Sequence, residues 1–273
     1  MPRLLLLLCV LVAAAPARAW NGGVHELICA MAWQQLQPAT RQWLNGIQSG
    51  ARDEHGDFAQ SCSWPDQVRL TEYRATYEYH FVNLPRGASG FELARDCAAF
   101  DCVAVAVHRY LHYVVDRADG DRLRERRAMA LRFLGHFIGD LHQPLHVGYG
   151  EDRGGNAIDV SYHGQATNLH ALWDTDLPVA LGYGDARAAR GLLATQRSAD
   201  AARWRQGNLA AWLNESFAVA KDAAYPVAGD HRLDDTEVAR LRPVVALQLQ
   251  KAAVRLAWLL DEAAAGRFAL QPL

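Results

Sequence analysis

The densest group of metal-ligating residue types lies near the middle of the chain, in the segment GHFIGDLHQPLH. Its His136 and Asp140 are four residues apart, so on a helix both side chains project from one face and can bind one ion. Pro144 is expected to break that helix, which lets His146 reach a neighbouring ion. His142 follows Asp140 by two residues and falls on the opposite side of the helix. We therefore predict that His142 packs behind the ligands or supports them.

A second pair with the same spacing is formed by His170 and Asp174. Histidine and aspartate four residues apart on a helix more often form a surface ion pair, so neither pair identifies a metal site by itself. His108 and His112 share the spacing but have no obvious third ligand nearby in the sequence. We predict that His108 and His112 are structural.

Further candidate ligands lie upstream of these pairs. His25 is near the N-terminus, Asp66 has Arg69 three residues later, and His80 stands beside the aromatic Phe81. None of the candidate ligands is a cysteine. Nitrogen and oxygen ligation with carboxylates is typical of catalytic zinc rather than of closed structural zinc sites. The residue types therefore favour a catalytic zinc centre over a structural one.

Helices must position these residues, because apolar residues recur at helical spacing in nearly every segment. The clearest cases are residues 24–31, 103–114, 134–141 and 245–259. Strand signals are few, and the best is the alternating stretch Ile158–Tyr162, which is bounded by glycine-rich turns. We predict a mainly α fold with one small β-hairpin.

Capping residues indicate where two of the helices begin. Asn168 is a good N-cap for a helix that starts at Leu169, and Pro178 is expected to close that helix. One of two adjacent aspartates ahead of Glu237 resembles a capping box for the last helices. No repeat, low-complexity linker or shift in composition follows residue 20, so a single domain is the simplest interpretation.

The first nineteen residues have the pattern of an export signal. Arg3 precedes the apolar run Leu4–Val12, and small residues at positions 17 and 19 suit cleavage before Trp20. Removing 19 of the 273 residues leaves a domain of 254 residues, 20–273, which is long enough to bury a sizeable core. No other apolar stretch approaches membrane length, so we expect a soluble product, secreted or periplasmic, with no membrane association.

The charge balance excludes a general basic surface. The full chain has 28 basic and 30 acidic residues, and removal of Arg3 and Arg18 with the signal leaves 26 basic residues, a net charge of −4. Such a chain has no broad basic footprint for duplex DNA or anionic membranes. Any positive charge that binds phosphate must therefore be local, and bound metal can provide it.

The cysteine pattern fits an oxidising compartment. Cys9 would leave with the signal, and four cysteines would remain in the exported domain. Cys97 and Cys102 are close enough in sequence to close a small loop, and we predict that disulfide. Cys29 and Cys62 either form a second pair or stay as free buried thiols, and the sequence favours neither alternative.

The candidate ligands as a set resemble those of a known family. They match, in order and with similar local spacing, the nine metal-binding positions of the S1/P1 nuclease family: Trp20, His25, Asp66, His80, His136, Asp140, His146, His170 and Asp174. The resemblance runs from Trp20 to the last helix, and the spacing from Cys97 to Cys102 resembles a disulfide of that family. It implies a helical domain of the zinc phospholipase C and P1 nuclease type.

The resemblance also implies an activity, cleavage of single-stranded DNA and RNA to 5′-phosphorylated products, with 3′-nucleotides as further substrates and no obligate protein partner. It implies three zinc ions per chain. By similarity, Asp66, His80, His136 and Asp140 hold one zinc, His146, His170 and Asp174 hold a second, and the amine and carbonyl of Trp20 with His25 and Asp140 hold the third. Asp140 would bridge two ions, as carboxylates do in paired-metal hydrolases.

Other residues match substrate-contacting positions of the family. By similarity, Asp66 orients the attacking water, and Arg69 and Asn156 stabilise charge that develops on the phosphate. Phe81 would stack on an unpaired base, although a core phenylalanine is the alternative interpretation. Asn83 stands where many fungal relatives carry aspartate, so the resemblance does not specify base preference at this substrate-binding position.

Two other functions use the same ligand types. A zinc phospholipase C usually has glutamate as its last ligand and a longer gap between the tryptophan and the first histidine. Asp174, the five-residue step from Trp20 to His25, and Phe81 favour a nuclease. A secreted zinc-binding protein without catalytic activity would have no need for Arg69 or for a site that is open to solvent.

Overall fold

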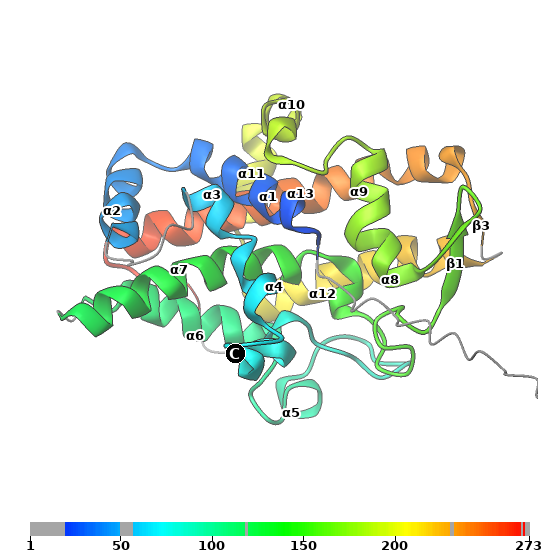
Figure 1. Cartoon of the computed structure of the whole chain (residues 1–273), viewed down its shortest axis with the longest axis horizontal. Coiled ribbons are helices and arrows are strands. Elements are labelled where there is room, and N and C mark those ends of the chain that lie inside the picture. Colours follow the sequence, from blue (N-terminus) through cyan, green and yellow to red (C-terminus); the bar gives the residue numbers. More distant parts are fainter. Residues whose placement is uncertain (1–19, 50–56, 118–119, 230–231, 269, 271–273) are drawn as a thin grey trace, which may run out of the picture.

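The computed structural model describes residues 20–49, 57–117, 120–229, 232–268 and 270. The predicted export signal, residues 1–19, lies outside the described residues. Figure 1 shows a mainly helical molecule in which the two longest helices run lengthwise and a small sheet lies at one end. Both the predicted α class and the small hairpin are confirmed. No helix in the described ranges combines the length and the apolar character that a membrane crossing requires.

The α-helices are α1 (Gly22–Gln35), α2 (Pro38–Gln48), α3 (Phe58–Ser61), α4 (Trp64–Val68), α5 (Leu93–Asp96), α6 (Val103–Val115), α7 (Asp121–Leu141), α8 (Leu169–Ala171), α9 (Leu177–Ala180), α10 (Ala189–Thr195), α11 (Ser198–Trp204), α12 (Leu209–Val219) and α13 (Asp235–Ala264). Short turns of other helical geometry are η1 (Arg74–His80), η2 (Pro144–Val147), η3 (Leu172–Asp176), η4 (Ala186–Ala188), η5 (Ala220–Ala224) and η6 (Pro226–Ala228). Helix α1 packs on α13, and α6 packs on α7.

Helix α13 is the longest element and supports the others from one side. Asp234 accepts a hydrogen bond from the backbone N–H of Glu237, whose side chain accepts one from the N–H of Asp234, so the predicted capping box is confirmed. Its buried face includes Val245, Leu249 and Leu256. Burying each such side chain stabilises the fold by about 1.5–3 kcal/mol. This apolar face holds α1 and α7, which carry candidate ligands, in fixed positions.

Helix α7 ends where the sequence predicts a break. Its last residue is Leu141, and after a short turn Pro144 begins η2 in a new direction. The C-terminal half of α7 is buried on all sides because α1, α4, α6, α13 and η1 pack around it. His136 and Asp140 therefore project from a rigid buried helix into the centre of the molecule.

The predicted hairpin pairs β1 (Asp159–Tyr162) with β2 (Gln165–Asn168) in antiparallel register. The turn residues His163 and Gly164 both have positive φ, the conformation that two-residue hairpin turns favour. A third strand, β3 (Arg232–Leu233), lies parallel to β1 and completes the sheet order β2-β1-β3. Strand β2 runs directly into α8, so the hairpin sets the position at which α8 begins.

The helix after β2 begins as predicted but does not end as predicted. Asn168 caps its first turn, yet the helix continues through Pro178 to Ala180. The reason is a wider turn at η3, where the N–H of Leu177 bonds the carbonyl of Leu172, five residues earlier. Proline has no N–H and its ring clashes with a regular helical turn, so the wider turn accommodates Pro178.

Two disulfides join parts of the described chain. Cys97–Cys102 is the predicted bond, and it is confirmed. Cys29 and Cys62, which the sequence left undecided, also pair, and they link α1 to the residue that follows α3. A Cβ at Gly135 of α7 would lie 2.5 Å from the Sγ of Cys62. Only glycine therefore lets α7 pass this close to the disulfide.

Candidate metal centre

Eight of the predicted ligands bring their side chains together from seven separate elements. They are His25 on α1, Asp66 on α4, His80 on η1, His136 and Asp140 on α7, His146 on η2, His170 on α8 and Asp174 on η3. Their ligand atoms form three groups, in each of which all atoms lie within 4.8 Å of one another: His25, Asp66 and His136; His80, His136 and Asp140; and His146, His170 and Asp174.

Three ligand atoms around His80 have the spacing of ligands that share one zinc ion. His80 Nδ1 lies 2.9 Å from Asp140 Oδ2 and 3.0 Å from His136 Nε2, and His136 Nε2 lies 3.2 Å from Asp140 Oδ2. Zinc bonds of about 2.0–2.1 Å place tetrahedral ligand atoms about 3.3 Å apart. These three atoms therefore fit around one ion. Asp66 Oδ1 lies close by, 3.7 Å from His80 Nδ1 and 3.6 Å from His136 Nε2, and shares a group with His136 and His25.

A second set of ligand atoms lies beside η2. His170 Nε2 is 3.2 Å from Asp174 Oδ2, and His146 Nε2 is 3.7 Å from Asp174 Oδ1. The imidazole rings of His146 and His170 are stacked, with ring centroids 5.0 Å apart. Both nitrogen atoms thus face the same carboxylate. This is the arrangement that two histidines and one aspartate need to bind a single ion.

Asp140 lies between the sets and faces a third position. Its Oδ1 is 3.4 Å from His25 Nε2 and 3.4 Å from His146 Nδ1, while its Oδ2 faces His80 and His136. The two oxygens of one carboxylate thus point to different groups of ligand atoms. A carboxylate in this position can bridge two ions.

The segment that begins at Trp20 lies against the same cluster. The backbone N–H of Asn21 donates to the carbonyl of Asp174 at 2.9 Å, and the Trp20 side chain is fully buried. The His25 ring stacks on His136 with centroids 3.7 Å apart. A Cβ at Gly139 would lie 2.7 Å from His25 Nδ1, so glycine on α7 makes room for the His25 ring.

Backbone carbonyls orient three of the histidines. The Nδ1 atoms of His136, His146 and His170 lie 2.9, 2.7 and 2.6 Å from the carbonyl oxygens of Cys62, His80 and Gly154. A carbonyl oxygen only accepts, so each of these Nδ1 atoms carries the hydrogen. Each Nε2 atom then keeps its lone pair for a metal ion, as in many zinc proteins.

Many polar atoms of the cluster have no hydrogen-bond partner within the described residues. They are both ring nitrogens of His25, Nε2 of His80 and His146, and one oxygen each of Asp66, Asp140 and Asp174. A buried polar atom without a partner costs about 1–3 kcal/mol. Cations coordinated by the carboxylate oxygens, by His25 and by Nε2 of His146 would satisfy most of these atoms, so the donor set fits bound divalent metal.

The carboxylates of the cluster favour positive charge. Burial lowers the pKa of His80 to about 4, even though Asp140 and Asp66 oppose that shift. Burial also acts to lower the pKa of His136, but Asp140 and Asp66 outweigh it and raise that pKa to about 10. Asp66 and Asp140 thus stabilise positive charge at His136 enough to offset its burial, whereas at His80 burial prevails.

The three histidines that the sequence assigned to structural roles lie outside these groups. His142 donates from Nδ1 to a carbonyl one turn earlier at 2.7 Å, and its Nε2 accepts from Arg255 at 2.8 Å. Burial, followed by the positive charge of Arg255, holds the pKa of His142 well below its usual value. His108 and His112 pack on Phe268.

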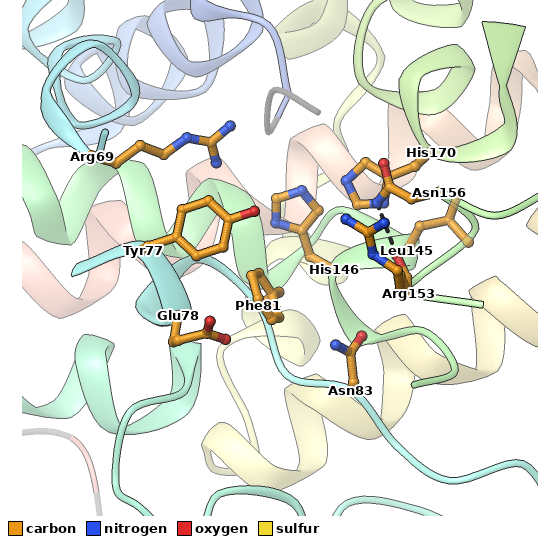
Figure 2. A pocket seen from close by; sticks show the side chains of 10 residues that line it. All are labelled: Arg69, Tyr77, Glu78, Phe81, Asn83, Leu145, His146, Arg153, Asn156 and His170. Atoms are coloured by element: carbon orange, nitrogen blue, oxygen red, sulfur yellow. Dashed lines mark hydrogen bonds between the residues drawn. The ribbon is translucent and has the colours of Figure 1, made fainter. Parts of the chain in front are cut away.

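A pocket of about 290 Å³ opens beside His146 and His170 (Figure 2). Its lining residues are Arg69, Tyr77, Glu78, Phe81, Asn83, Leu145, His146, Arg153, Asn156 and His170. All four residues predicted to contact substrate without binding metal, Arg69, Phe81, Asn83 and Asn156, lie in its wall. His146 and His170 are in the wall too, so a molecule in the pocket would lie next to the candidate metal ligands.

The predicted substrate-contacting residues have distinct environments. Arg69 is almost fully buried, and its Nη1 lies 3.3 Å from Asp66 Oδ1. Phe81 is half-buried in the pocket wall, a position that suits a stacking surface better than a core residue. Asn156 donates from its side-chain amide to the carbonyl of Arg153 at 2.8 Å.

Sequence reasoning missed Gln143, which is fully buried next to the cluster. Its Nε2 donates to Asp174 Oδ1 at 2.5 Å, and its Oε1 accepts from the N–H of Leu145 at 2.5 Å. These two contacts orient the Asp174 carboxylate. The signal was its place within the ligand-rich segment, but a glutamine before a proline is otherwise typical of an exposed turn.

Comparison with known proteins agrees with this geometry. A family model described as S1/P1 nuclease matches residues 20–265. Endonuclease 1 of Arabidopsis thaliana is 34% identical over 185 residues, which are 64% of this chain and 60% of that protein. Endonuclease 2 of the same plant is 29% identical over 270 residues, 91% of each chain. Nuclease S1 of Aspergillus oryzae is 32% identical over 190 residues, 67% of this chain and 64% of that protein.

The matches with Endonuclease 1 and nuclease S1 thus span less than two thirds of those proteins, whereas the match with Endonuclease 2 spans nearly all of it. The family model covers the described chain from Trp20 into the loop after α13, including every element that carries a candidate ligand. This chain belongs to the S1/P1 nuclease family.

Proposed function

We propose that this protein is a zinc-dependent endonuclease that hydrolyses single-stranded DNA and RNA to 5′-phosphorylated products and also removes phosphate from 3′-nucleotides. The observation that carries the proposal is the placement of three groups of buried ligand atoms beside a pocket whose wall holds Arg69 and Phe81. The names of the relatives, all nucleases or endonucleases, point to the same class of substrate.

The proposed cofactor is three zinc ions. Asp66, His80, His136 and Asp140 would hold the first, His146, His170 and Asp174 the second, and the amine and carbonyl of Trp20 with His25 and Asp140 the third. Zinc in these positions would supply a Lewis acid for the phosphate and activate water as the nucleophile. Six positive charges against three carboxylates leave a local charge of about +3, which suits a phosphate site in an acidic protein.

The side chains around the ligands have separate tasks in this proposal. Asp66 Oδ1 has no hydrogen-bond partner within the described residues. The Asp66 carboxylate can therefore accept a hydrogen bond from the attacking water and orient it. Arg69, held by Asp66, donates to phosphate oxygens on which charge develops, and Asn156 donates from the opposite wall. Contacts within the protein already hold Arg69 and Asn156 in place before substrate binds.

Preference for single strands follows from Phe81. A phenyl ring in a pocket wall can stack on a base only if that base has left its own stack. Bases in a duplex are paired and stacked, and extruding one costs a few kcal/mol. The pocket would therefore accept any unpaired base, while Asn83, which can donate as well as accept hydrogen bonds, would read its edge.

We also propose that the protein is exported and that residues 1–19 are removed. The two disulfides are typical of an oxidising compartment. Cleavage before Trp20 creates a primary amine next to a carbonyl, and this pair can chelate an ion through a five-membered ring. The bond from Asn21 to Asp174 would hold that amine beside the cluster.

A digestion panel tests the proposed function. Purified protein lacking residues 1–19 is incubated with single-stranded DNA, RNA, duplex DNA, a 3′-nucleotide and phosphatidylcholine, and mass spectrometry locates the phosphate on each product. We expect 5′-phosphorylated oligonucleotides from single strands, phosphate release from the 3′-nucleotide and little product from duplex DNA. Turnover of phosphatidylcholine alone would show a phospholipase, and zinc-loaded protein without any turnover would show a zinc-binding protein.

A further inference from the structure

Two arginines approach the pocket from different elements. Figure 2 shows Arg69, which follows α4, on one side and Arg153, from the loop between η2 and β1, on the other, with Phe81 between them. The proposed function assigns Arg69 to the phosphate that is cleaved. It leaves Arg153 without a role.

The two guanidinium groups differ in their surroundings. Arg69 is 5% exposed, pairs with Asp66 and lies over the ring of Tyr77 at 5.8 Å. Arg153 is exposed, and no carboxylate within the described ranges pairs with it. The neighbouring Asp152 is already engaged by Arg86 at 2.9 Å and by the hydroxyl of Tyr225 at 3.0 Å. Among the residues that the structure describes, no carboxylate therefore neutralises the charge of Arg153.

The backbone holds Arg153 in an uncommon conformation. Its φ is +57°, in the left-handed region that residues with a Cβ rarely adopt. The loop keeps this conformation through hydrogen bonds from the N–H of Arg153 to the carbonyl of Gly150 at 3.1 Å and from the Asn156 amide to the carbonyl of Arg153 at 2.8 Å. Gly154 and Gly155, also at positive φ, continue the turn. The hydrogen-bonded loop thus fixes the backbone at Arg153, whose side chain lines the pocket.

We propose that Arg153 binds the second phosphate of the nucleotide whose base stacks on Phe81. A nucleotide inside a strand has one phosphate on each side of its sugar. With the scissile phosphate at Arg69 and the metal ligands, the other phosphate would lie toward Arg153, whose planar guanidinium can bind two phosphate oxygens at once. A 3′-nucleotide has no such second phosphate. Arg153 would therefore be a specificity residue that favours strands over mononucleotides, and this inference rests on the proposed function.

The substitution Arg153→Gln tests the inference. It removes the positive charge, and because glutamine also has a Cβ, the energetic cost of the positive-φ backbone stays similar. We expect kcat/KM on a single-stranded thymidine oligonucleotide to fall about tenfold, mainly through KM, the loss expected for one charge-assisted hydrogen-bonding contact. Activity on a 3′-nucleotide should stay within about twofold. The slope of log kcat/KM against log salt concentration should become shallower by about 0.7, the value for one lost phosphate contact on a single strand.

Two matched variants separate the local charge from general effects. Arg153→Lys retains the charge and should keep the wild-type salt slope, with only part of the affinity. Arg190→Gln removes one exposed positive charge from α10, which does not line the pocket. It should change the activity on neither the oligonucleotide nor the 3′-nucleotide. Zinc content and melting temperature of all three variants should match the wild type.

Binding of a non-cleavable phosphorothioate thymidine oligonucleotide, followed by fluorescence anisotropy, keeps the inference separate from the proposed activity. Weaker binding by Arg153→Gln, with wild-type binding by Arg190→Gln, supports the role of Arg153 even if the wild type cleaves nothing. Equal binding by Arg153→Gln and wild type overturns it. An equal loss of activity on the oligonucleotide and the 3′-nucleotide overturns it as well.

Discussion

At the scale of single residues, the metal centre and the pocket are one continuous site. His146 and His170 belong both to a group of ligand atoms and to the pocket wall, and Phe81 directly follows His80 in the chain. A base on Phe81 would therefore place its sugar and phosphate next to the ligands. This proximity turns a metal-binding cluster into a candidate phosphodiesterase.

Removing the aromatic ring tests the stacking role of Phe81. Phe81→Ala should raise KM for single-stranded oligonucleotides by roughly 5- to 150-fold, because stacking on an aromatic side chain contributes about 1–3 kcal/mol per base. The effect on kcat should be smaller, and zinc content should not change. Phe81→Trp retains a stacking face and serves as the control. Unchanged oligonucleotide kinetics in Phe81→Ala would return Phe81 to a packing role.

At the scale of elements, small residues decide how closely the ligand-bearing helices approach one another. On helix α7, Gly135 lies against the Cys29–Cys62 disulfide and Gly139 lies against the His25 ring, one helical turn later. These glycines and the ligands His136 and Asp140 share the same short stretch. Close approach at Gly139 brings α1 near enough for His25 to meet Asp140.

A methyl group at Gly139 should disturb this approach. Gly139→Ala places a Cβ 2.7 Å from His25 Nδ1, so the ring or α1 must shift. We expect a loss of about 1–3 kcal/mol in the free energy of unfolding, the usual cost of overpacking a core. Zinc content should drop by about one ion per chain. Gly46→Ala on α2, where nothing lies within 4 Å, should instead stabilise the protein slightly, and equal results for both variants would contradict the explanation.

Lengthening the chain at Trp20 tests the third proposed site. A variant with one alanine before Trp20 has an amide nitrogen at that position, whose lone pair is delocalised, and an amide is a poor zinc ligand. It should bind about two zinc ions by elemental analysis and lose most of its activity. Three ions and full turnover in the extended protein would refute the assignment of Trp20.

The parts of this site that the sequence predicted are those with local signals. The four-residue spacing of His136 and Asp140, the hairpin around His163 and the capping box at Glu237 each depend on neighbours in the chain. Long-range features carried no such signal. The pairing of Cys29 with Cys62 and the contact of Gln143 with Asp174 depend on how distant segments pack. The prediction that the helix ends at Pro178 was wrong, because the wider turn of η3 accommodates the proline.

At the scale of the whole molecule, a buried charge network supports the ligand helix from behind. Arg255 on α13 bonds Glu215 of α12 at 2.7 Å, the carbonyl of Trp204 at 2.8 Å and His142 at the end of α7 at 2.8 Å. Lys251 also pairs with Glu215 at 2.8 Å. The network joins four helices next to the point where α7 ends.

Neutralising Glu215 should destabilise the fold in a pH-dependent way. Glu215→Gln leaves the buried Arg255 without its charged partner, and we expect a loss of about 1–2 kcal/mol near neutral pH, reduced because Glu215 is 40% exposed. Burial acts to raise the pKa of Glu215, but Arg255 and Lys251 lower it below the usual value. Its contribution is therefore complete above the unfolded pKa of about 4.3 and is lost as pH falls through the lower folded pKa.

Urea denaturation at several pH values measures this contribution. The difference between wild type and Glu215→Gln should shrink as the pH falls below about 4.3. Glu262→Gln removes another carboxylate of α13, whose partner Arg267 lies beyond the helix and is exposed, and should alter stability by less than about 0.5 kcal/mol. A pH-independent difference for Glu215→Gln would mean that packing, rather than charge, explains its effect.

Metal analysis combined with activity bears most directly on the proposed zinc cluster. Protein lacking residues 1–19 is stripped with a chelator and titrated with zinc, and bound zinc and cleavage of single-stranded DNA are measured at each step. We expect no cleavage in the stripped protein and full recovery only as bound zinc approaches three ions per chain. Full activity with a single bound ion, or cleavage that persists after chelation, would contradict the three-zinc centre.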